Sequence, residues 1–568
     1  MKSRRLTRGL ARADLGLLTA AFGVVLLTAP ADGQQTTRVS VDSAGVEGNG
    51  LSLSTAISAD GRIVAFDSYA SNLVAGDTNG HWDVFVHDRL TGTTERLSVD
   101  SSGAQGNNYS LDPDISADGQ IVAFESLASN LVAGDKKGYW DVFVHDRSTG
   151  VTERVSVDSS GAQGNRSSDS PSISADGQIV AFSSYATNLV GGDTNGFVDV
   201  FVRDRSTGLT ERVSVDSSGA EGNIDSVSPS ISADGQIVAF FSGASNLVPG
   251  DTNGYADVFV HDRSTGLTER VSVDSSGGEG NNDSYLPAIS ADGQIVAFES
   301  NASNLVAGDT NRNPDVFVYN RSTGVTERVS VDSSGAQGND VSGDPSISAD
   351  GKIVAFVSGA SNLVGGDTNV RIDVFVHDCL TGITERVSVD SSGAEGNGHS
   401  YIEYPAISAD GQIVAFSSYA SNLVSGDTNG AYDIFVHERC RVDANWMNYG
   451  AGFPGSTGVP PFTSRGDPVF GSKLTLDLAN SYGNDTPGLL LVGYQDAVIP
   501  TNRGGELLLI TAVITLLNVR WTGITIEGDV PDQANLCGIE VFLQVLEIDP
   551  GAARGVSFTA GLKLVLGE

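Results

Sequence analysis

The chain repeats one stretch, Ile115-Ser116-Ala117-Asp118-Gly119-Gln120-Ile121-Val122-Ala123-Phe124, along most of its 568 residues. The first five residues of this stretch recur with five spacings of 58 residues and one of 60. The copies begin at Ile57, Ile115, Ile173, Ile231, Ile289, Ile347 and Ile407. A fixed period of this size indicates that one supersecondary unit is stacked side by side, because a single unit cannot bury its own apolar face. We therefore expect seven copies of one unit.

Each repeat contains four stretches with the pattern of β-strands, which the second repeat shows in order. A short strand ends at Ile115, and Asp118-Gly119 supplies a two-residue hairpin turn before the apolar run 121–124. The third strand is 141–145, and after a short turn the fourth is 153–158. Strands two and three are almost continuously apolar, as strands covered on both faces are, whereas strand four alternates like a half-exposed strand. This order is typical of a β-propeller blade.

The fourth strands show how the ring closes. Arg-Val-Ser-Val, or its Leu variant, starts at Arg38, Arg96, Arg154, Arg212, Arg270, Arg328 and Arg386. The seventh repeat has no such strand after its third strand, 433–437, whereas a spare copy at 38–41 precedes the first repeat. Pairing the spare strand with the last three strands would leave no unpaired edge. We predict a seven-bladed propeller over residues 35–439, with the N-terminal strand completing the last blade.

The repeat resembles the blade motif of TolB-like and WD-repeat-like β-propellers. The resemblance rests on Ile-Ser-Ala-Asp-Gly-x-Ile-Val-Ala-Phe followed by Asp-Val-Phe-Val-x-Asp-Arg-x-Thr-Gly, and it covers roughly 400 residues. It implies the propeller fold. Such propellers serve protein docking, ligand binding and as accessory domains of peptidases, so the resemblance does not select one function.

Residues 1–31 have the pattern of a secretion signal. Five basic residues between Lys2 and Arg12 precede an apolar run, 15–27, and Ala29-Pro30-Ala31 supplies the small residues of a cleavage site. The mature chain would start near Asp32. No later stretch has the roughly 18 uninterrupted apolar residues of a spanning helix. We expect an extracytoplasmic protein that is secreted, periplasmic or held at the cell surface.

The period stops near Arg441, and residues 440–568 form a second region of different composition. Six short strand-like stretches lie there, at 474–478, 489–492, 507–510, 524–526, 539–543 and 562–566, separated by turn residues. This pattern predicts a β-sandwich. The region resembles small all-β C-terminal modules of large secreted bacterial proteins, which implies surface attachment or partner contact. Export would permit a disulfide between Cys440 and Cys537, but with Cys379 three pairings stay open.

The composition excludes one class of partner. The chain carries 33 Lys and Arg residues against 70 Asp and Glu residues, a net charge of −37. Because such a surface repels phosphate backbones, we expect no nucleic-acid binding.

The two long connections of each repeat should emerge on the same side of the disc. These are the connection between strands two and three and the connection from strand four to the next blade. Binding residues concentrate on such loops. In six repeats the first long loop follows the pattern Gly-Asp-Thr-Asn-Gly-x-x-Asp or its equivalent. The pattern places oxygen donors at Asp77, Asn79 and Asp83, and likewise at Asp193, Asn195, Asp199, Asp251, Asn253, Asp257, Asp309, Asn311, Asp315, Asp367, Asn369, Asp373, Asp427, Asn429 and Asp433.

Two interpretations of these loops stay open. Alternating oxygen donors around a glycine resemble the start of a calcium-binding loop, although the later bidentate Glu of an EF-hand is missing. The second repeat reads Asp135-Lys136-Lys137-Gly138, which puts an ammonium group where a ligand would be. The alternative is structural, because Asp and Asn side chains fold back onto their own backbone in Asx-turns. Ca²⁺ is the one cofactor that the sequence suggests.

Histidines and aromatic residues follow the repeat in different ways. Five histidines, His87, His145, His261, His377 and His437, share one repeat position, which indicates packing rather than ligation. His81 and His399 lie on the long loops instead. The same side carries Tyr69, Trp82, Tyr109, Tyr139, Trp140, Tyr185, Tyr255, Tyr285, Tyr401, Tyr404 and Tyr419. These rings could stack on sugars or anchor a peptide, or could fill gaps between blades.

No motif of a catalytic nucleophile or a zinc hydrolase is present, since Gly-x-Ser-x-Gly and His-Glu-x-x-His are both absent. We therefore expect a monomeric, non-catalytic binding or scaffolding protein whose long-loop face binds a protein or carbohydrate. The alternative is an extracytoplasmic glycosidase or lyase that uses carboxylates of the propeller channel or the loop face. Nothing in the sequence indicates which two carboxylates would form the catalytic pair.

Overall fold

A computed structural model describes residues 13–14, 34–135, 138–400, 404–439, 445–469, 472–493, 496–500, 506–509, 513–530, 540–553 and 556–566. Residues Gln35–Glu438 form one compact unit, and the described residues before and after it form the other. The described residues contain strands and no helix, so no helix among them could cross a membrane. The signal at 1–31, apart from the two residues of β1 (Ala13–Asp14), and the pair Cys440 and Cys537 lie outside the described residues.

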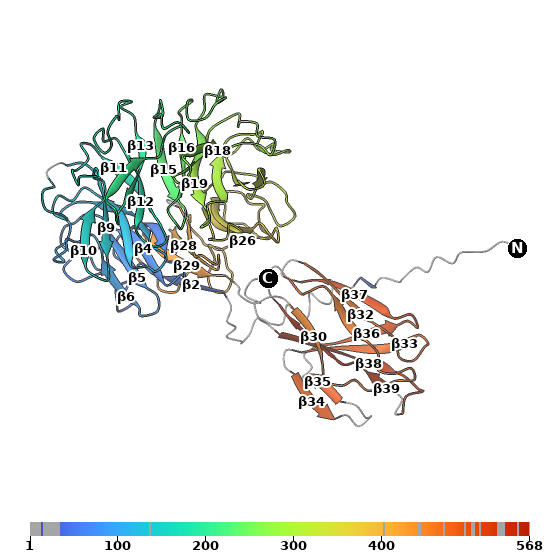
Figure 1. Cartoon of the computed structure of the whole chain (residues 1–568). Helices are drawn as coiled ribbons and strands as arrows, with labels where there is room; N and C mark the ends of the chain where they lie inside the picture. Colours follow the sequence, from blue (N-terminus) through green and yellow to red (C-terminus); the bar gives the residue numbers. More distant parts are fainter. Residues whose placement is uncertain are drawn as a thin grey trace. The chain divides into compact units, whose positions relative to one another are not determined.

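The first unit consists of seven four-stranded antiparallel sheets (Figure 1). Blade one is β3 (Ser52–Ile57), β4 (Ile63–Ser68), β5 (Asp83–Asp88) and β6 (Thr93–Arg96). Blade two is β7 (Ser110–Ile115), β8 (Ile121–Ser126), β9 (Asp141–Asp146) and β10 (Val151–Arg154). Blade three is β11 (Ser168–Ile173), β12 (Ile179–Ser184), β13 (Asp199–Asp204) and β14 (Leu209–Arg212). Blade four is β15 (Ser226–Ile231), β16 (Ile237–Ser242), β17 (Asp257–Asp262) and β18 (Leu267–Arg270).

The remaining three blades continue the series. Blade five is β19 (Ser284–Ile289), β20 (Ile295–Ser300), β21 (Asp315–Asn320) and β22 (Val325–Arg328). Blade six is β23 (Ser342–Ile347), β24 (Ile353–Ser358), β25 (Asp373–Asp378) and β26 (Thr384–Arg386). Blade seven is β27 (Ala406–Ile407), β28 (Ile413–Ser418), β29 (Asp433–Glu438) and β2 (Gln35–Arg38). The predicted seven-bladed, all-β propeller is confirmed.

The propeller core lies between neighbouring blades. Val142 and Val144 of β9 pack with Val180 and Phe182 of β12 in one buried cluster. The hairpin glycine also stands at this junction. Gly119 has a φ of +70°, and a Cβ there would lie 2.6 Å from Cγ1 of Ile63 in the preceding blade. Only glycine combines the left-handed turn with this close approach, which explains why Asp-Gly recurs in every repeat.

The N-terminal strand completes blade seven as the sequence predicts. Thr37 pairs with Val436, and Arg38 pairs with Phe435. The backbone N–H of Val39 donates to the carbonyl of Ile434 at 2.8 Å. The ring therefore closes through pairing of the first and last strands of the propeller.

The fourth strands end earlier than the alternation predicts. β10 covers Val151–Arg154, whereas residues 153–158 were expected to form the strand. After Arg154 the N–H of Val155 still donates to the carbonyl of Val142 at 2.9 Å, and the hydroxyl of Ser156 then donates to Oδ1 of Asp141 at 2.7 Å. Val157 then pairs with Gln163 in a small hairpin. Side-chain hydrogen bonding thus replaces the last half of the expected strand.

The second unit contains two sheets that enclose a common core, which confirms the predicted sandwich. One sheet has the order β1, β37 (Ile524–Asp529), β32 (Lys473–Leu478) and β31 (Phe462–Arg465). The other has the order β30 (Asn445–Tyr449), β40 (Gly561–Val565), β38 (Glu540–Ile548), β33 (Thr486–Gly493) and β36 (Val513–Val519), with β39 (Val556–Phe558) beside β38. A separate pair is formed by β34 (Asp496–Pro500) and β35 (Glu506–Leu509). Buried leucines and valines of both sheets, such as Leu476 and Leu543, form the core.

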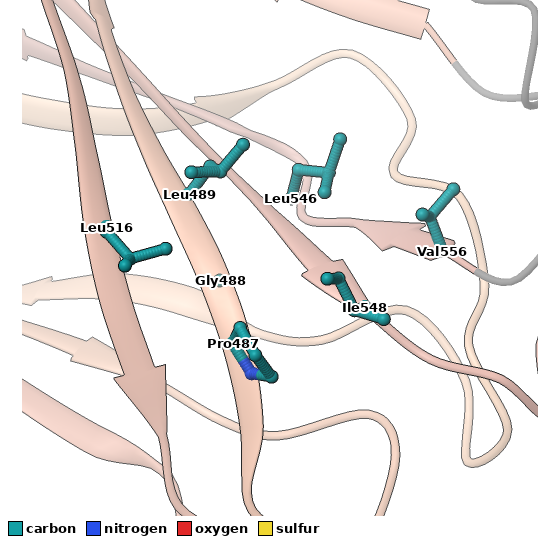
Figure 2. A pocket seen from close by; sticks show the side chains of 7 residues that line it. All are labelled: Pro487, Gly488, Leu489, Leu516, Leu546, Ile548 and Val556. Carbon is teal, nitrogen blue, oxygen red and sulfur yellow. The ribbon is translucent and has the colours of Figure 1, made fainter.

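An apolar pocket of about 350 Å³ lies on the larger sheet of the sandwich (Figure 2). Its walls are Pro487, Gly488, Leu489, Leu516, Leu546, Ile548 and Val556. No charged side chain lines the pocket, so it offers an apolar surface but no group that could act as an acid, a base or a metal ligand.

Candidate functional site on the long-loop face

The two long loops of each blade lie on the same face of the propeller and bind each other. The loop 69–82, between β4 and β5, meets the loop 97–109, which leads into blade two. Nδ2 of Asn79 donates to the carbonyl of Gly106 at 3.0 Å. The same loop also meets the preceding blade-to-blade loop, since the N–H of Asn49 donates to Oδ1 of Asn72 at 2.8 Å. We call this side of the propeller the long-loop face.

An arginine at the end of each fourth strand lies beside two aspartates, which in six of the seven blades are predicted metal ligands. Nη1 of Arg212 is 3.2 Å from Oδ2 of Asp199 and 3.6 Å from Oδ1 of Asp193. The Arg212 side chain is only 9% exposed. The equivalent groups are Arg38 with Asp427 and Asp433, Arg96 with Asp77 and Asp83, Arg154 with Asp135 and Asp141, Arg270 with Asp251 and Asp257, Arg328 with Asp309 and Asp315, and Arg386 with Asp367 and Asp373. We call each group an arginine node.

The asparagine of each predicted trio takes part in an Asx-turn. Oδ1 of Asn195 accepts the N–H of Phe197 at 2.9 Å, and its Nδ2 donates to Oδ2 of Asp199 at 3.0 Å. Asn79, Asn253, Asn311, Asn369 and Asn429 make the same two contacts. The structure therefore brings the two aspartates of each trio together, but it directs the asparagine oxygen to the backbone.

A fourth residue of the node was not singled out from the sequence. In blade three, Oε2 of Glu221 is 2.8 Å from Nη1 of Arg212, and Oε1 accepts the hydroxyl of Thr194 at 2.5 Å. In blade five the same position is Gln337, whose Nε2 donates to Asp309 at 2.9 Å and to Asp315 at 2.8 Å. The constant spacing of nine residues after each strand-four arginine was the signal that could have found this position.

The node charge therefore differs between blades. Glu occupies the fourth position at Glu47, Glu221, Glu279 and Glu395, and Gln occupies it at Gln105, Gln163 and Gln337. A node with Glu holds three carboxylates against one guanidinium, and a node with Gln holds two. Burial and the neighbouring Asp199 carboxylate raise the pKa of Asp193 to about 6. Excess negative charge is thus concentrated in the Glu nodes.

Two of the Glu nodes bring three carboxylates close enough to share a cation. Oxygen atoms of Glu47, Asp427 and Asp433 lie within 4.8 Å of one another, as do those of Asp193, Asp199 and Glu221. In the second group, Oδ1 of Asp193 is buried without a hydrogen-bond partner. These acidic clusters could hold a metal ion.

The repeated histidines lie in the blades and pack against the fourth strand. Nδ1 of His145 lies 2.8 Å from the hydroxyl of Thr152, and burial lowers the pKa of this histidine. His87, His261, His377 and His437 make the equivalent contact to threonine. The two histidines that do not recur lie on the long loops, where His81 stacks edge-on against Tyr109.

Aromatic side chains cover part of the long-loop face. Tyr69, Tyr139, Tyr185, Tyr255 and Tyr419 are each between 41% and 50% exposed. Neighbouring rings stand together, with 6.0 Å between the centroids of Tyr69 and Trp82. The positions before and after the first long loop are aromatic at Tyr419, Tyr432, Tyr69, Trp82, Tyr139, Trp140, Tyr185, Phe197 and Tyr255, and Tyr109 lies between blades one and two. We call these residues the aromatic arc; it runs over blades seven, one, two, three and four.

The inner strands surround a central channel with a cavity of about 320 Å³. Five of them shift register at a residue that precedes proline and has a positive φ. These residues are Asp112, Ser170, Ser228, Leu286 and Asp344. In a non-glycine residue this conformation is uncommon and strained. A side chain of the preceding blade supports it, since the N–H of Ser170 donates to Oε2 of Glu125 at 3.1 Å.

Carboxyl groups gather at the channel between blades one, two and three. Burial and the charge of Asp112 raise the pKa of Glu125 to about 8. Burial likewise raises the pKa of Asp67 to about 7 and those of Asp112, Asp114 and Asp169 to about 6. Of these groups, Asp112 and Asp114 line the channel cavity.

The seven four-stranded sheets define the chain as a β-propeller protein with an appended β-sandwich. No protein-family model and no curated protein matches it. Solved structures with similar folds include a putative TolB from Agrobacterium tumefaciens, at 16% identity and a TM-score of 0.31, covering 49% of this chain and 80% of that chain. The WD40 repeats of RRP9 match at 10% identity and a TM-score of 0.38, covering 72% of this chain and 99% of that chain. A GH74 xyloglucanase from Xanthomonas campestris matches at 10% identity and a TM-score of 0.39, covering 78% of this chain and 59% of that chain.

Proposed function

We propose that this chain is an extracytoplasmic, non-catalytic binding or scaffolding protein that holds a protein or carbohydrate ligand on its long-loop face. The observation that carries the proposal is the exposure of the aromatic arc. Large rings that remain 41–50% exposed contribute little to folding, but they supply binding energy when a ligand covers them. The blades hold the loops rigidly, so the rings are presented without a large entropic loss on binding.

A binding screen with a matched pair of variants tests this proposal. The mature chain is screened against immobilised polysaccharides and proteins, and each hit is repeated with Tyr69→Ala/Tyr419→Ala and with Leu90→Ala. Leu90 is 75% exposed in the short turn between β5 and β6, on the opposite face. We expect the double tyrosine variant to lose binding and the leucine variant to retain it. Equal loss in both variants, or in neither, would exclude the long-loop face as the binding surface.

We also propose that the two Glu nodes with clustered carboxylates, those of Glu47 and Glu221, bind Ca²⁺. The buried Oδ1 of Asp193 and the three clustered carboxylates of blade three support this assignment. Oxygen donors of this kind are the ligands that Ca²⁺ prefers. The ion would have to displace Nη1 of Arg212, which lies 2.8 Å from Glu221, so we expect weak affinity.

Thermal melts in CaCl₂ or in chelator test the calcium assignment. An ion that binds only the folded chain raises the midpoint as its free concentration increases. We expect this rise in the wild type and its loss in Glu47→Gln/Glu221→Gln, which copies the Gln nodes. Gln337→Ala serves as a control outside the Glu nodes. Identical melts with and without Ca²⁺ in the wild type would exclude calcium at these nodes.

A glycosidase remains the second candidate, because the channel places carboxyl groups of different pKa together. Glu125, with a pKa of about 8, would stay protonated and could act as an acid, while Asp169, with a pKa of about 6, would be mostly ionised at neutral pH. Such a pair is what glycoside hydrolysis requires. Reducing-sugar release from polysaccharides, compared between the wild type and Glu125→Gln, tests this candidate. Activity that is absent in both proteins rejects it.

A further inference from the structure

The blades of this propeller are so alike that differences between them are informative. In blades five and six the positions of the arc rings are Asn301, Asn313, Pro314, Gly359, Arg371 and Ile372. The loops nevertheless keep the same local structure. The N–H of Asn313 donates to Oδ1 of Asn311 at 2.9 Å, as that of Phe197 does to Asn195. The fold therefore does not require aromatic residues at these positions.

Some rings of the arc stand in pairs. In blade seven the ring centroids of Tyr419 and Tyr432 are 5.3 Å apart, and in blade one those of Tyr69 and Trp82 are 6.0 Å apart. His81 and Tyr109, at 4.8 Å, connect the loop of blade one with the loop that leads into blade two. A row of similar rings at repeated positions presents a periodic surface.

The node carboxylates beside the arc are buried. Asp77 and Asp83 contact Arg96, Asp193 and Asp199 contact Arg212, and none of these four carboxylate side chains is more than 5% exposed. Because these carboxylates are buried, they offer little to a bulky cationic ligand. The net charge of −37 also disfavours an anionic ligand. Neither the burial of the node carboxylates nor the net negative charge disfavours a neutral ligand.

We propose that the aromatic arc binds an extended, neutral polysaccharide, with successive sugar rings stacked on successive aromatic rings. This inference rests on the proposed function and specifies its ligand. The apolar C–H faces of pyranose rings pack well on Tyr and Trp, whose polar tips remain in water. A polymer of identical units can present the same apolar face to each of these rings, whereas the surface of a folded protein does not. Blades five and six have no aromatic residue at the arc positions, so the polysaccharide would leave the long-loop face there.

Affinity electrophoresis and calorimetry test the inference on the mature full-length chain. The probes are hydroxyethyl cellulose, galactomannan and dextran as neutral polymers, polygalacturonate as an anionic polymer and chitosan as a cationic one. We expect binding to at least one neutral polymer. Its affinity should be the same at about 50 and about 500 mM salt, ionic strengths that span weak and strong screening of charge. Tyr69→Ala, Tyr185→Ala and Tyr419→Ala should each weaken it by roughly 3- to 10-fold.

Several controls separate the possible outcomes. Tyr185→Phe keeps the ring and should retain binding, and Asn301→Ala, in blade five, should leave it unchanged. Melting midpoints show that each variant is folded. Salt-sensitive binding of chitosan alone overturns the inference, and so does a protein ligand that is lost with the same tyrosine variants; both outcomes leave the proposed function intact. If no ligand depends on the arc, the inference and the proposed function fail together.

Discussion

The backbone N–H of Ala409 donates to the carbonyl oxygen of Ala59 at 3.0 Å, which joins the seventh blade to the first. The same bond joins every other pair of neighbours, from Ala59 to Ala117 and onward through Ala175, Ala233, Ala291, Ala349 and Ala409. The seven bonds return to their starting residue. The inner edge of the propeller is therefore closed by backbone hydrogen bonds, while β2 closes its outer edge.

Removal of the closing strand should destabilise the propeller. Deleting residues 35–41 exposes the edge of β29 and loses Val39, which is 1% exposed. We expect a loss of more than about 3 kcal/mol, since burying one valine contributes about 1.5 kcal/mol or more and the strand pairing is lost with it. The exposed edge should also promote self-association. Thermal melts and light scattering measure both effects, with a chain that starts at Gln34 as the control. An unchanged midpoint in the deletion would contradict the closure.

The arginine nodes should respond to charge in a blade-dependent manner. Arg212→Met leaves Asp193, Asp199 and Glu221 facing one another, whereas Arg328→Met leaves two carboxylates and Gln337. Removing one partner of a buried ion pair costs about 3–5 kcal/mol. We expect the larger loss in Arg212→Met at pH 8.

The difference between these two variants should shrink as the pH falls to 5. The pKa of Asp193 is raised to about 6, so as the pH falls this carboxylate is protonated in the folded state at a higher pH than in the unfolded chain. Protonation removes one of the three negative charges that face one another in Arg212→Met. Urea denaturation at both pH values measures the effect. Equal losses at pH 8 would show that the fourth residue of the node does not matter.

Cys379 interrupts a ring of ion pairs on the short-loop side. In other blades an arginine occupies its position; Nε of Arg205 contacts Glu153 at 2.6 Å, and its Nη1 donates to the carbonyl of Gly177 at 2.5 Å. Cys379→Arg should restore both contacts, with Glu327 and Gly351 as the partners. We expect a gain of about 1 kcal/mol, because the pair is only partly buried.

The reverse substitution provides the control for the Cys379 variant. Arg205→Cys should lose a similar amount of stability, measured by the same thermal melt. A Cys379→Arg variant that is less stable than the wild type would show that the cavity around this side chain cannot accept the guanidinium.

Val370 occupies a backbone conformation that suits glycine. Its φ is +54°, and it is 88% exposed, whereas the equivalent Gly80 has a φ of +68°. The left-handed conformation costs a non-glycine residue about 1–2 kcal/mol, and more for a β-branched one. Val370→Gly should therefore raise stability by about 0.5–1 kcal/mol after the entropy of glycine is included. Gly80→Val should lower stability in the same denaturation assay, and a stable Gly80→Val variant would contradict this account.

The channel carboxyls should make the propeller less stable in alkaline conditions. The pKa of Glu125 is raised from 4.5 to about 8, so the folded state keeps a proton that the unfolded chain releases above pH 4.5. The stability therefore falls as the pH rises from about 5 to 8, by roughly 2–4 kcal/mol if the full shift applies. Glu125→Gln should flatten this dependence and be more stable than the wild type at pH 8. Melting midpoints across this range test the prediction, and an unchanged slope in the variant would contradict it.

Much of the fold follows from local patterns. The strands around Phe124 and Phe143 were predicted because apolar runs of this length, separated by turn residues, form buried strands. The six strands predicted in the C-terminal region coincide with parts of β32, β33, β35, β37, β38 and β40. The pattern did not reveal β30, β31, β34 and β39, whose apolar residues are few or irregular, and it missed β36 although Val-Ile-Thr-Leu-Leu-Asn-Val is largely apolar.

The site was harder to predict, because its partners are distant in sequence. The alternation of β14 suggested only a half-exposed strand, yet the Arg212 side chain turns inward and contacts Asp193, 19 residues before it in the sequence. Glu125 accepts the N–H of Ser170 and lies in the field of the Asp169 carboxyl only because adjacent blades pack side by side. The strand-four arginine recurs in every repeat, but recurrence alone does not distinguish a buried, paired charge from a solvated one.

Periodicity alone was enough to establish the number of blades, the closing strand and the face that carries the long loops, because each follows from counting strands and alternating their direction. Packing between blades decided the rest. It set which carboxylates contact an arginine, which carboxyl groups have a raised pKa through burial, and which rings stay exposed on the arc. Those properties depend on distance and solvent access in three dimensions, and identical repeats acquire them differently through single changes such as Glu221 for Gln337.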